Sequence, residues 1–270
     1  MSITAPSSED VLVEQRDDIA IITLNRPDRL NAISYAMLDE LAARMVEADQ
    51  DPYIRCVVLT GAGKGFCAGL DLVDVSKRGT GNRFSKKRPK QLFNIRNSPV
   101  TVMWNMDTPV ICALNGAAAG YGMDVALLCD IRICGESGKL APVTAKRNVV
   151  PESGGTWLLP RLVGWAKASE IYFRARVLKA EESLEMGLVN TVVADDKVME
   201  TALEWAREIA DNAPLAVQTT KRMMRMGLEQ SYETSVDQLM MHLEGMFQSD
   251  DFKEGVAAFL ERRKPEFTGR

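Results

Sequence analysis

The sequence has little histidine and lacks closely paired cysteines. Its 270 residues contain 1 histidine and 5 cysteines, and no CxxC motif occurs. Structural zinc sites need closely spaced cysteine and histidine ligands, so we predict no metal site. The cysteines stand mostly inside apolar runs, which indicates buried thiols in a reducing compartment. They are Cys56, Cys67, Cys112, Cys129 and Cys134.

Long apolar runs and an excess of basic charge are also missing. No run approaches the roughly 20 apolar residues that cross a bilayer. The net charge of -4 and the pI of about 5.3 argue against a nucleic-acid-binding protein, which is normally basic. Residues 1–15 lack the basic start and apolar stretch of a secretory signal. We therefore expect a cytoplasmic protein with no nucleic-acid or membrane partner.

Short β-rich runs alternate with helical periodicity up to about residue 196. The clearest helical pattern covers residues 35–50, where Ser34 can cap the first turn. Alternation of this kind predicts an α/β fold. The strand-like runs, which end near Gly, Asn or Asp, are residues 11–15, 19–25, 56–61, 109–116, 131–136 and 188–194.

The chain divides by pattern into a core, residues 1–196, and an almost purely helical region, residues 197–270. The helical region either packs on a partner molecule or covers the core of its own chain, and we favour the partner. Residues 76–90 carry seven basic side chains and no apolar period. A solvated loop is the simpler interpretation of this segment, and a mobile basic flap that attracts a polyanionic ligand is the alternative.

Two glycine-rich segments each follow a predicted strand. In residues 59–72 the glycines let a ligand approach the main chain closely, but Lys64 is followed by Gly65, so this is not a Walker loop. In residues 109–130 small residues lead into a helix that begins near Gly120. The first N–H groups of such a helix lack intrahelical partners and carry positive potential, which would stabilise an oxyanion. Tight strand–helix packing is the simpler explanation.

Acidic residues stand close to these segments. Asp124 falls one turn into the predicted helix, where it is either a helix-end carboxylate or part of a pocket wall. Glu152 follows Pro151 within residues 147–164 and precedes two glycines. Taken alone, an acid in that position is more typical of a loop than of a catalyst.

In this order and spacing, the three segments together resemble the enoyl-CoA hydratase/isomerase (crotonase) family. Further matches lie at residues 25–34, 178–193 and 254–267, so the resemblance covers nearly the whole chain. It implies a crotonase-like spiral of β-β-α turns followed by a C-terminal helical trimerisation region, in homotrimers or dimers of trimers. It also implies an acyl-CoA thioester as substrate and no separate cofactor, because coenzyme A is part of that substrate.

The resemblance places Ala68 and Tyr121 at the two backbone N–H positions of an oxyanion hole. Such a hole stabilises the enolate formed from a thioester, and the loss of one donor typically costs ~10²–10³-fold in rate. Tyr121 stands where the family commonly has glycine, so its side chain is expected near the acyl pocket. Ala68 is also expected to contact the coenzyme A moiety.

The acid positions decide which reaction follows. Hydratases of the family hold one water between two glutamates, and the matching residues here are Asp124 and Thr144. Threonine is no general base at ordinary pH, which argues against hydration. Glu152 lies in a Pro-acid-x-Gly context that resembles the isomerase members, in which one carboxylate moves a proton between two carbons. We expect apolar neighbours for Glu152, including Phe66 and Trp157.

Binding of coenzyme A is expected to use cationic and apolar side chains. By resemblance, Arg29 contacts the nucleotide end, and Phe259 and Arg262 reach the ligand of a neighbouring subunit. A simple surface role is the alternative for both arginines. Cys67 has no histidine partner in its vicinity and is interpreted as a packing residue.

The preferred hypothesis is an enzyme that shifts a double bond in an enoyl-CoA, with Glu152 as the proton shuttle and Asp124 assisting. The first alternative is an enoyl-CoA hydratase, which adds water to a 2-enoyl-CoA. The second alternative is a non-catalytic acyl-CoA-binding protein that keeps the oxyanion hole but does not use the acids.

Overall fold

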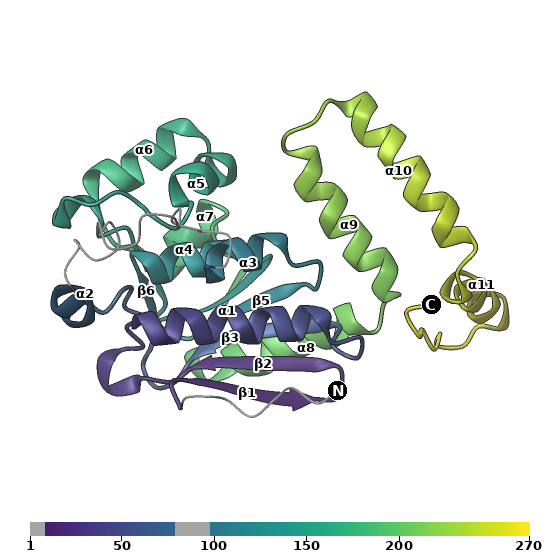
Figure 1. Ribbon diagram of the computed structural model, residues 1–270, viewed down its shortest axis with the longest axis horizontal. Coiled ribbons are helices and arrows are strands. Elements are labelled where there is room, and N and C mark those ends of the chain that lie inside the picture. Colours follow the sequence, from purple (N-terminus) through teal and green to yellow (C-terminus); the bar gives the residue numbers. More distant parts are fainter. Residues whose placement is uncertain (1–8, 79–97) are drawn as a thin grey trace, which may run out of the picture.

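The computed structural model describes residues 9–78 and 98–270, and its centre is a six-stranded sheet (Figure 1). The strand order is β1-β2-β3-β5-β7-β10, and within this sheet only β1 and β2 pair antiparallel. All six predicted runs form strands of this sheet, which confirms the α/β class. Their bounds are β1 Val11–Arg16, β2 Ile19–Leu24, β3 Cys56–Gly61, β5 Val110–Leu114, β7 Ile131–Gly135 and β10 Thr191–Val193.

A second sheet has four very short strands in the order β4-β6-β8-β9. These strands were not predicted, because two or three residues carry no readable alternation. Strands β4, β6 and β8 each follow a strand of the large sheet along the chain and precede a helix, so the β-β-α turn recurs as the resemblance implied. Their bounds are β4 Gly65–Cys67, β6 Ala117–Ala119, β8 Lys139–Ala141 and β9 Leu178–Lys179.

Helix α1, Tyr35–Gln50, covers one face of the large sheet (Figure 1). Its bounds agree with the prediction, and the Ser34 hydroxyl accepts a hydrogen bond from the Met37 N–H at 3.2 Å. Its inner face contributes fully buried apolar side chains to the core. The other helices of the core are α2 Leu72–Arg78, α3 Pro99–Asn105, α4 Tyr121–Leu128, α5 Gly155–Val163, α6 Trp165–Arg174 and α7 Ala180–Glu185.

The C-terminal helices divide into two kinds. Helix α8, Val198–Ala210, packs Ala202 and Ala206 on the other face of the large sheet, so it covers the core of its own chain. Helices α9, Pro214–Gly227, and α10, Tyr232–Phe247, contain no buried residue. They project from the core with α11, Asp250–Glu261 (Figure 1). The boundary at residue 196 stays a prediction.

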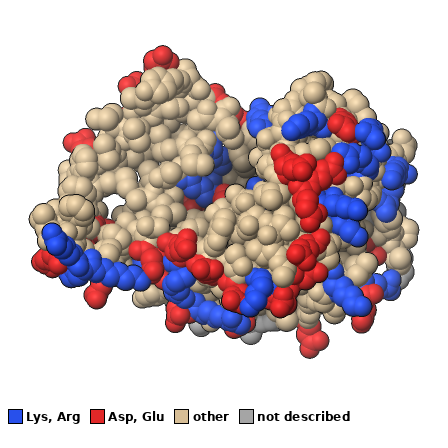
Figure 2. All heavy atoms as spheres, turned by 180° about the vertical axis from the view of Figure 1, so that it is seen from behind, with Lys and Arg blue, Asp and Glu red and all other residues tan. Residues whose placement is uncertain are grey.

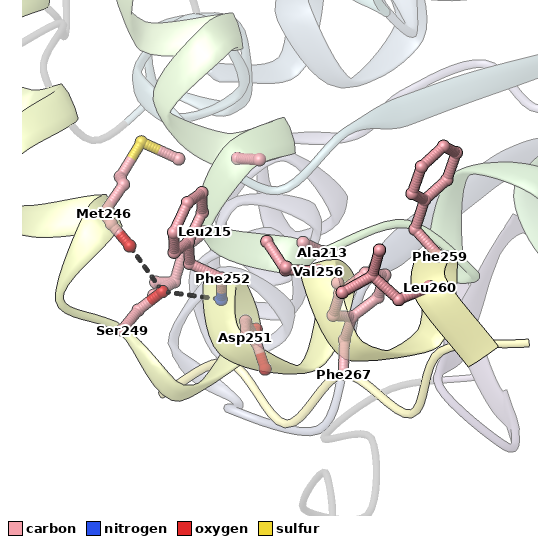
Figure 3. A pocket seen from close by; sticks show the side chains of 12 residues that line it. Ala213, Leu215, Met246, Ser249, Asp251, Phe252, Val256, Phe259, Leu260 and Phe267 are labelled. Carbon is pink, nitrogen blue, oxygen red and sulfur yellow. Dashed lines mark hydrogen bonds between the residues drawn. The ribbon is translucent and has the colours of Figure 1, made fainter.

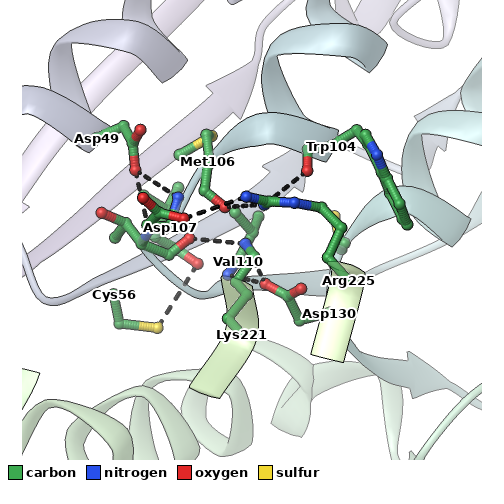
Figure 4. Close-up of polar contacts among 12 residues, drawn as sticks. Asp49, Cys56, Trp104, Met106, Asp107, Val110, Asp130, Lys221 and Arg225 are labelled. Carbon is green, nitrogen blue, oxygen red and sulfur yellow. Dashed lines mark hydrogen bonds and ion pairs between the residues drawn. The ribbon is translucent and has the colours of Figure 1, made fainter. Parts of the chain in front are cut away.

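Ion pairs fix α9 to the core (Figure 4). The Asp107 carboxylate pairs with Arg222 and Arg225 of this helix, and the Lys221 ammonium lies 2.7 Å from the Asp130 carboxylate. The Arg225 guanidinium also donates to the Trp104 carbonyl at 2.8 Å. Because Asp107 precedes β5 and Asp130 precedes β7, two neighbouring strands of the large sheet, the projecting helices are tied to the sheet.

Apolar side chains gather on the outer surface of α9–α11. Figure 2 shows few charges over α9 and α10, whereas charges crowd over the rest of that face. A trimerisation role for this surface stays a prediction. Within the described chain, no helix is long and apolar enough to span a bilayer. The most exposed of these side chains are Met224, Tyr232, Met240, Met241, Phe259 and Leu260.

Candidate functional site

The N-terminus of α4 forms one wall of the candidate site. Gly120 precedes the helix with φ 51°, and its N–H donates to the Ala141 carbonyl at 2.9 Å. Tyr121 is the first helical residue, as the sequence indicated. In the described parts of the chain, nothing accepts a hydrogen bond from the Tyr121 N–H. This donor is therefore available to a ligand oxygen.

The second wall is the segment from Phe66 to Asp71, and here the structure corrects a predicted donor. The Ala68 N–H donates to the Leu30 carbonyl at 2.9 Å. The prediction that Ala68 supplies a free oxyanion donor is therefore wrong, because its N–H already has a partner within the chain. The side chain of Ala68 is exposed, so its predicted contact with coenzyme A is unaffected.

Leu70 presents the free N–H of this segment. It forms a parallel bridge with Ile33, in which the Ile33 N–H donates to the Gly69 carbonyl at 2.8 Å and the Asp71 N–H donates to the Ile33 carbonyl at 2.9 Å. In such a bridge the central N–H points away from the partner. Within residues 9–78 and 98–270, the Leu70 N–H has no hydrogen-bond acceptor.

Gly69 brings this N–H beside that of Tyr121. A Cβ at Gly69 would stand 2.7 Å from the Ala119 carbonyl oxygen and 3.5 Å from the Tyr121 nitrogen. Its φ of 94° also belongs to the left-handed region that glycine adopts readily. The backbone of residues 69–70 can therefore approach the start of α4 only because residue 69 has no side chain.

Asn31 anchors the loop that precedes this wall. Its fully buried amide donates to the Ala62 carbonyl at 2.9 Å and to the Gly65 carbonyl at 2.7 Å, and its oxygen accepts from the Arg26 N–H at 2.8 Å. No local pattern in residues 25–34 predicts this role. In the structure Asn31 has φ 56°, a conformation that asparagine tolerates better than most residues.

Asp124 is a buried carboxyl behind the first turn of α4. Its side chain is 3% exposed, and the Ser153 hydroxyl donates to Oδ2 at 2.6 Å. Burial raises the pKa of Asp124 to about 6, the negative charge of Glu152 adds to the increase, and the hydrogen bond from Ser153 opposes it. Asp124 can thus change protonation near neutral pH.

Glu152 lies in the turn before α5, close enough for its charge to act on Asp124 and on Tyr121. The structure therefore brings together the two predicted acids and one predicted donor. The Glu152 side chain is exposed, so apolar neighbours do not enclose its carboxylate. Phe66 is buried in the core, and Trp157 packs edge-to-face on Trp104 with ring centroids 4.8 Å apart.

The Tyr121 side chain turns inward toward the same acids. Its hydroxyl is buried and has no hydrogen-bond partner among the described residues. Burial raises the pKa of this hydroxyl, and the charges of Glu152 and Asp124 raise it further. Cys67 packs close by, and burial raises the pKa of its thiol to about 12. An un-ionised thiol is a poor nucleophile, which supports the packing interpretation of Cys67.

Thr144 occupies the rim of this site. It is half-buried, and its carbonyl accepts the Arg147 N–H at 2.9 Å at the start of the short helix Ala145–Arg147. The adjacent Val143 methyl would lie 3.6 Å from a Cβ at Gly120, so this segment borders the start of α4. The hydroxyl of Thr144 therefore stands near the site without adding a carboxylate to it.

Comparison with known proteins agrees with this architecture. A family model described as enoyl-CoA hydratase/isomerase matches residues 14–270. The chain belongs to the enoyl-CoA hydratase/isomerase family. It is therefore an enzyme of a family that acts on acyl-CoA thioesters.

Some relatives of this enoyl-CoA hydratase/isomerase family member are named isomerases and others are named hydratases. The 1,2-epoxyphenylacetyl-CoA isomerase of Escherichia coli K12 is 36% identical over 97% of this chain and 99% of its own. The short-chain-enoyl-CoA hydratase of Clostridium acetobutylicum is 34% identical over 95% and 97%. The crystal structure of an enoyl-CoA hydratase from Bacillus anthracis superposes with a TM-score of 0.90 at 33% identity, over 97% of this chain and all of that one.

The residues predicted to contact coenzyme A in this family member do not lie together within one chain. Arg29 is exposed at the end of the short helix Pro27–Arg29, near the loop that Asn31 anchors. Phe259 is 82% exposed and Arg262 ends α11, on the far side of the molecule from α4 (Figure 1). Their action on the ligand of a neighbouring subunit stays a prediction.

Phe259 also borders an apolar cavity of about 440 Å³ formed by α9, α10, α11 and the C-terminal tail (Figure 3). Phe252 and Phe267 line the same cavity.

Of the basic segment 76–90, residues 76–78 belong to α2, and residues 79–90 lie outside the described residues.

Proposed function

We propose that this enzyme shifts a double bond in an enoyl-CoA through a thioester enolate, with Glu152 as the proton shuttle. The observation that carries the proposal is an exposed Glu152 carboxylate whose charge reaches Tyr121, the residue with a free N–H, with no second glutamate at residue 144. The relative named 1,2-epoxyphenylacetyl-CoA isomerase supports an isomerase. The relative named short-chain-enoyl-CoA hydratase keeps hydration as the second candidate.

The oxyanion hole in this proposal consists of the N–H groups of Leu70 and Tyr121. Both donors are free in the described chain and belong to facing segments. A thioester oxygen between them would receive two hydrogen bonds as it gains negative charge. Preorganised donors of this kind stabilise the charge without reorganisation during the reaction.

The reaction needs one proton and no water. The Glu152 carboxylate removes a proton from C2 of a 3-enoyl-CoA, and the C–H electron pair forms a dienolate whose charge rests on the thioester oxygen. The resulting carboxylic acid then returns the same proton to C4, which leaves a 2-enoyl-CoA and the original carboxylate. No separate cofactor is required, because coenzyme A is part of the substrate.

Asp124 assists as a buried charge behind the shuttle. It is 3% exposed and cannot meet the substrate directly without rearrangement. When Asp124 is ionised, it repels the negative charge of Glu152, and the arrival of a proton on Glu152 relieves that repulsion. Proton removal from C2 is thereby favoured.

The substitution Glu152→Gln tests the shuttle. We expect kcat for 3-enoyl-CoA isomerisation to fall ~10²–10⁴-fold, the usual contribution of a general base, with ligand affinity unchanged. The assay follows 2-enoyl, 3-enoyl and dienoyl thioesters and identifies each product. Normal isomerisation by the variant would refute the shuttle, rapid hydration by the wild type would favour the hydratase, and binding without any turnover would favour the non-catalytic protein.

The substitution Tyr121→Pro tests the oxyanion hole. Proline is tolerated at the first position of a helix and lacks the N–H, so the variant removes the proposed donor while α4 is retained. Tyr121→Ala is the matched control, because it removes the ring and keeps the N–H. We expect kcat to be ~10²–10³-fold lower in Tyr121→Pro than in Tyr121→Ala. Equal rates in the two variants would exclude this donor.

Association into trimers, with Arg29, Phe259 and Arg262 around coenzyme A, completes the proposal. The exposed apolar surface of α9–α11 supports it. Sedimentation of the full chain should show a trimer or a dimer of trimers. Phe259→Ala and Arg262→Ala should raise the Kd for coenzyme A thioesters in the assembled protein, and an unchanged Kd in both variants would contradict this role.

A further inference from the structure

A second buried tyrosine lies on the side of Asp124 that faces α6. The hydroxyl of Tyr172 is buried and, in the described part of the chain, has no hydrogen-bond partner. A buried hydroxyl without a partner destabilises the fold, because it has lost its hydrogen bonds to water. No step of the proposed reaction uses Tyr172, so the presence of its hydroxyl at this position needs another explanation.

Gly155 shows how close Tyr172 comes to Asp124. A Cβ at Gly155 would lie 2.3 Å from Oδ1 of Asp124 and 2.3 Å from the Tyr172 hydroxyl oxygen, so the two oxygens are at most 4.6 Å apart. Because residue 155 is glycine, no side chain separates them. A small rotation of either side chain would bring them to the roughly 2.7 Å of an O–H···O hydrogen bond.

We propose that Tyr172 is a positioning residue that donates a hydrogen bond to Oδ1 of Asp124 and keeps that carboxyl ionised. Oδ2 already accepts the Ser153 hydroxyl at 2.6 Å, so the two oxygens would each have a donor. Burial, followed by the charge of Asp124, raises the pKa of Tyr172, so its hydroxyl keeps its proton for donation.

The other groups that face Asp124 act in both directions. Glu152, from the turn before α5, opposes ionisation of Asp124 by like charge, and burial does the same. The backbone N–H groups of Ser153 and Gly155 act the other way and favour the charged form. The Tyr121 hydroxyl lies within the field of both acids. A donor on Oδ1 would shift this balance toward the carboxylate.

The importance of Tyr172 for the reaction rests on the proposed function, but its effect on Asp124 can be measured without substrate. Infrared difference spectra of the full-length protein between pH 4 and pH 9 report the protonated carboxyl band, and Asp124→Asn identifies the band of Asp124. In Tyr172→Phe we expect the midpoint to rise so that the ratio of protonated to ionised Asp124 near neutral pH increases about tenfold. Tyr53→Phe, at an exposed tyrosine between α1 and β3, is the control and should leave the midpoint unchanged.

Gly155→Ala provides a second variant, because its methyl group would force Oδ1 and the Tyr172 hydroxyl apart. It should shift the midpoint in the same direction as Tyr172→Phe, and the double variant should shift it no further. An unchanged midpoint in Tyr172→Phe, or additive shifts in the double variant, would overturn the proposal. If the midpoint shifts but Glu152→Gln still isomerises normally, the positioning role stands and the proposed function fails.

Discussion

Replacing Asp124 by asparagine should change how the stability of the protein depends on pH. The folded protein holds the pKa of Asp124 at about 6, compared with 3.8 for an unperturbed aspartate. One pKa unit corresponds to about 1.4 kcal/mol, so the full linkage amounts to about 3 kcal/mol. The raised pKa means that the stabilising contribution of the protonated form is present below pH 3.8 and is lost as the pH rises through about 6.

Between pH 4.5 and pH 8 the free energy of unfolding of the wild type should therefore fall by about 2 kcal/mol through Asp124. The Asp124→Asn variant should not show this decrease. The measurement is urea denaturation at both pH values, at one protein concentration because an oligomer is expected. Thermal unfolding should show the same trend, at about 2 °C per kcal/mol for a chain of this size. Asp39→Asn, at an exposed aspartate of α1, is the control. A wild-type-to-Asp124→Asn difference that stays constant with pH would refute the buried, proton-binding Asp124.

Three further predictions follow from the packing around the site. Asn31→Ala should lower the free energy of unfolding by about 3 kcal/mol, because its three hydrogen bonds are lost from a buried position; a loss below ~1 kcal/mol would show that the anchor is unimportant. Asp107→Ala should speed limited proteolysis between α8 and α9, because Arg222 and Arg225 lose their partner; an unchanged cleavage rate would contradict that tether. Native protein at pH 8 should not react with thiol reagents, since all five cysteines are buried and the pKa of Cys67 is raised to about 12; rapid labelling of Cys67 would disprove its burial.

The large sheet and α1 could be predicted because their signals are local. Each strand of that sheet except β10 is five or six residues long and, apart from β1, mostly apolar, and Ser34 caps a helix with a regular apolar face. The small sheet could not be predicted in the same way, because Gly65–Cys67 and its partners are held by pairing with strands far away in the sequence. Their pairing is a product of the fold.

The free N–H donors of the site also show how far local sequence features can predict structure. Tyr121 could be recognised from local features, since any first helical residue has an unpaired N–H. The choice between Ala68 and Leu70 depends on the Leu30 carbonyl and on Ile33, which approach from a loop more than thirty residues earlier. No local pattern in residues 59–72 reveals which N–H those groups occupy.

The contrast between the two acids favours one assignment of roles. A proton shuttle must meet the substrate and exchange protons with it, and of the two only Glu152 is exposed. Asp124 is buried, so its charge acts at a distance through a medium of low dielectric constant, where its electric field is strong. If Tyr172 and Ser153 keep Asp124 ionised, its charge favours proton transfer onto Glu152 at every turnover. Loss of Tyr172 should then lower kcat most between the Asp124 midpoints of the wild type and the variant, where Asp124 is mostly ionised only in the wild type, and KM should change little.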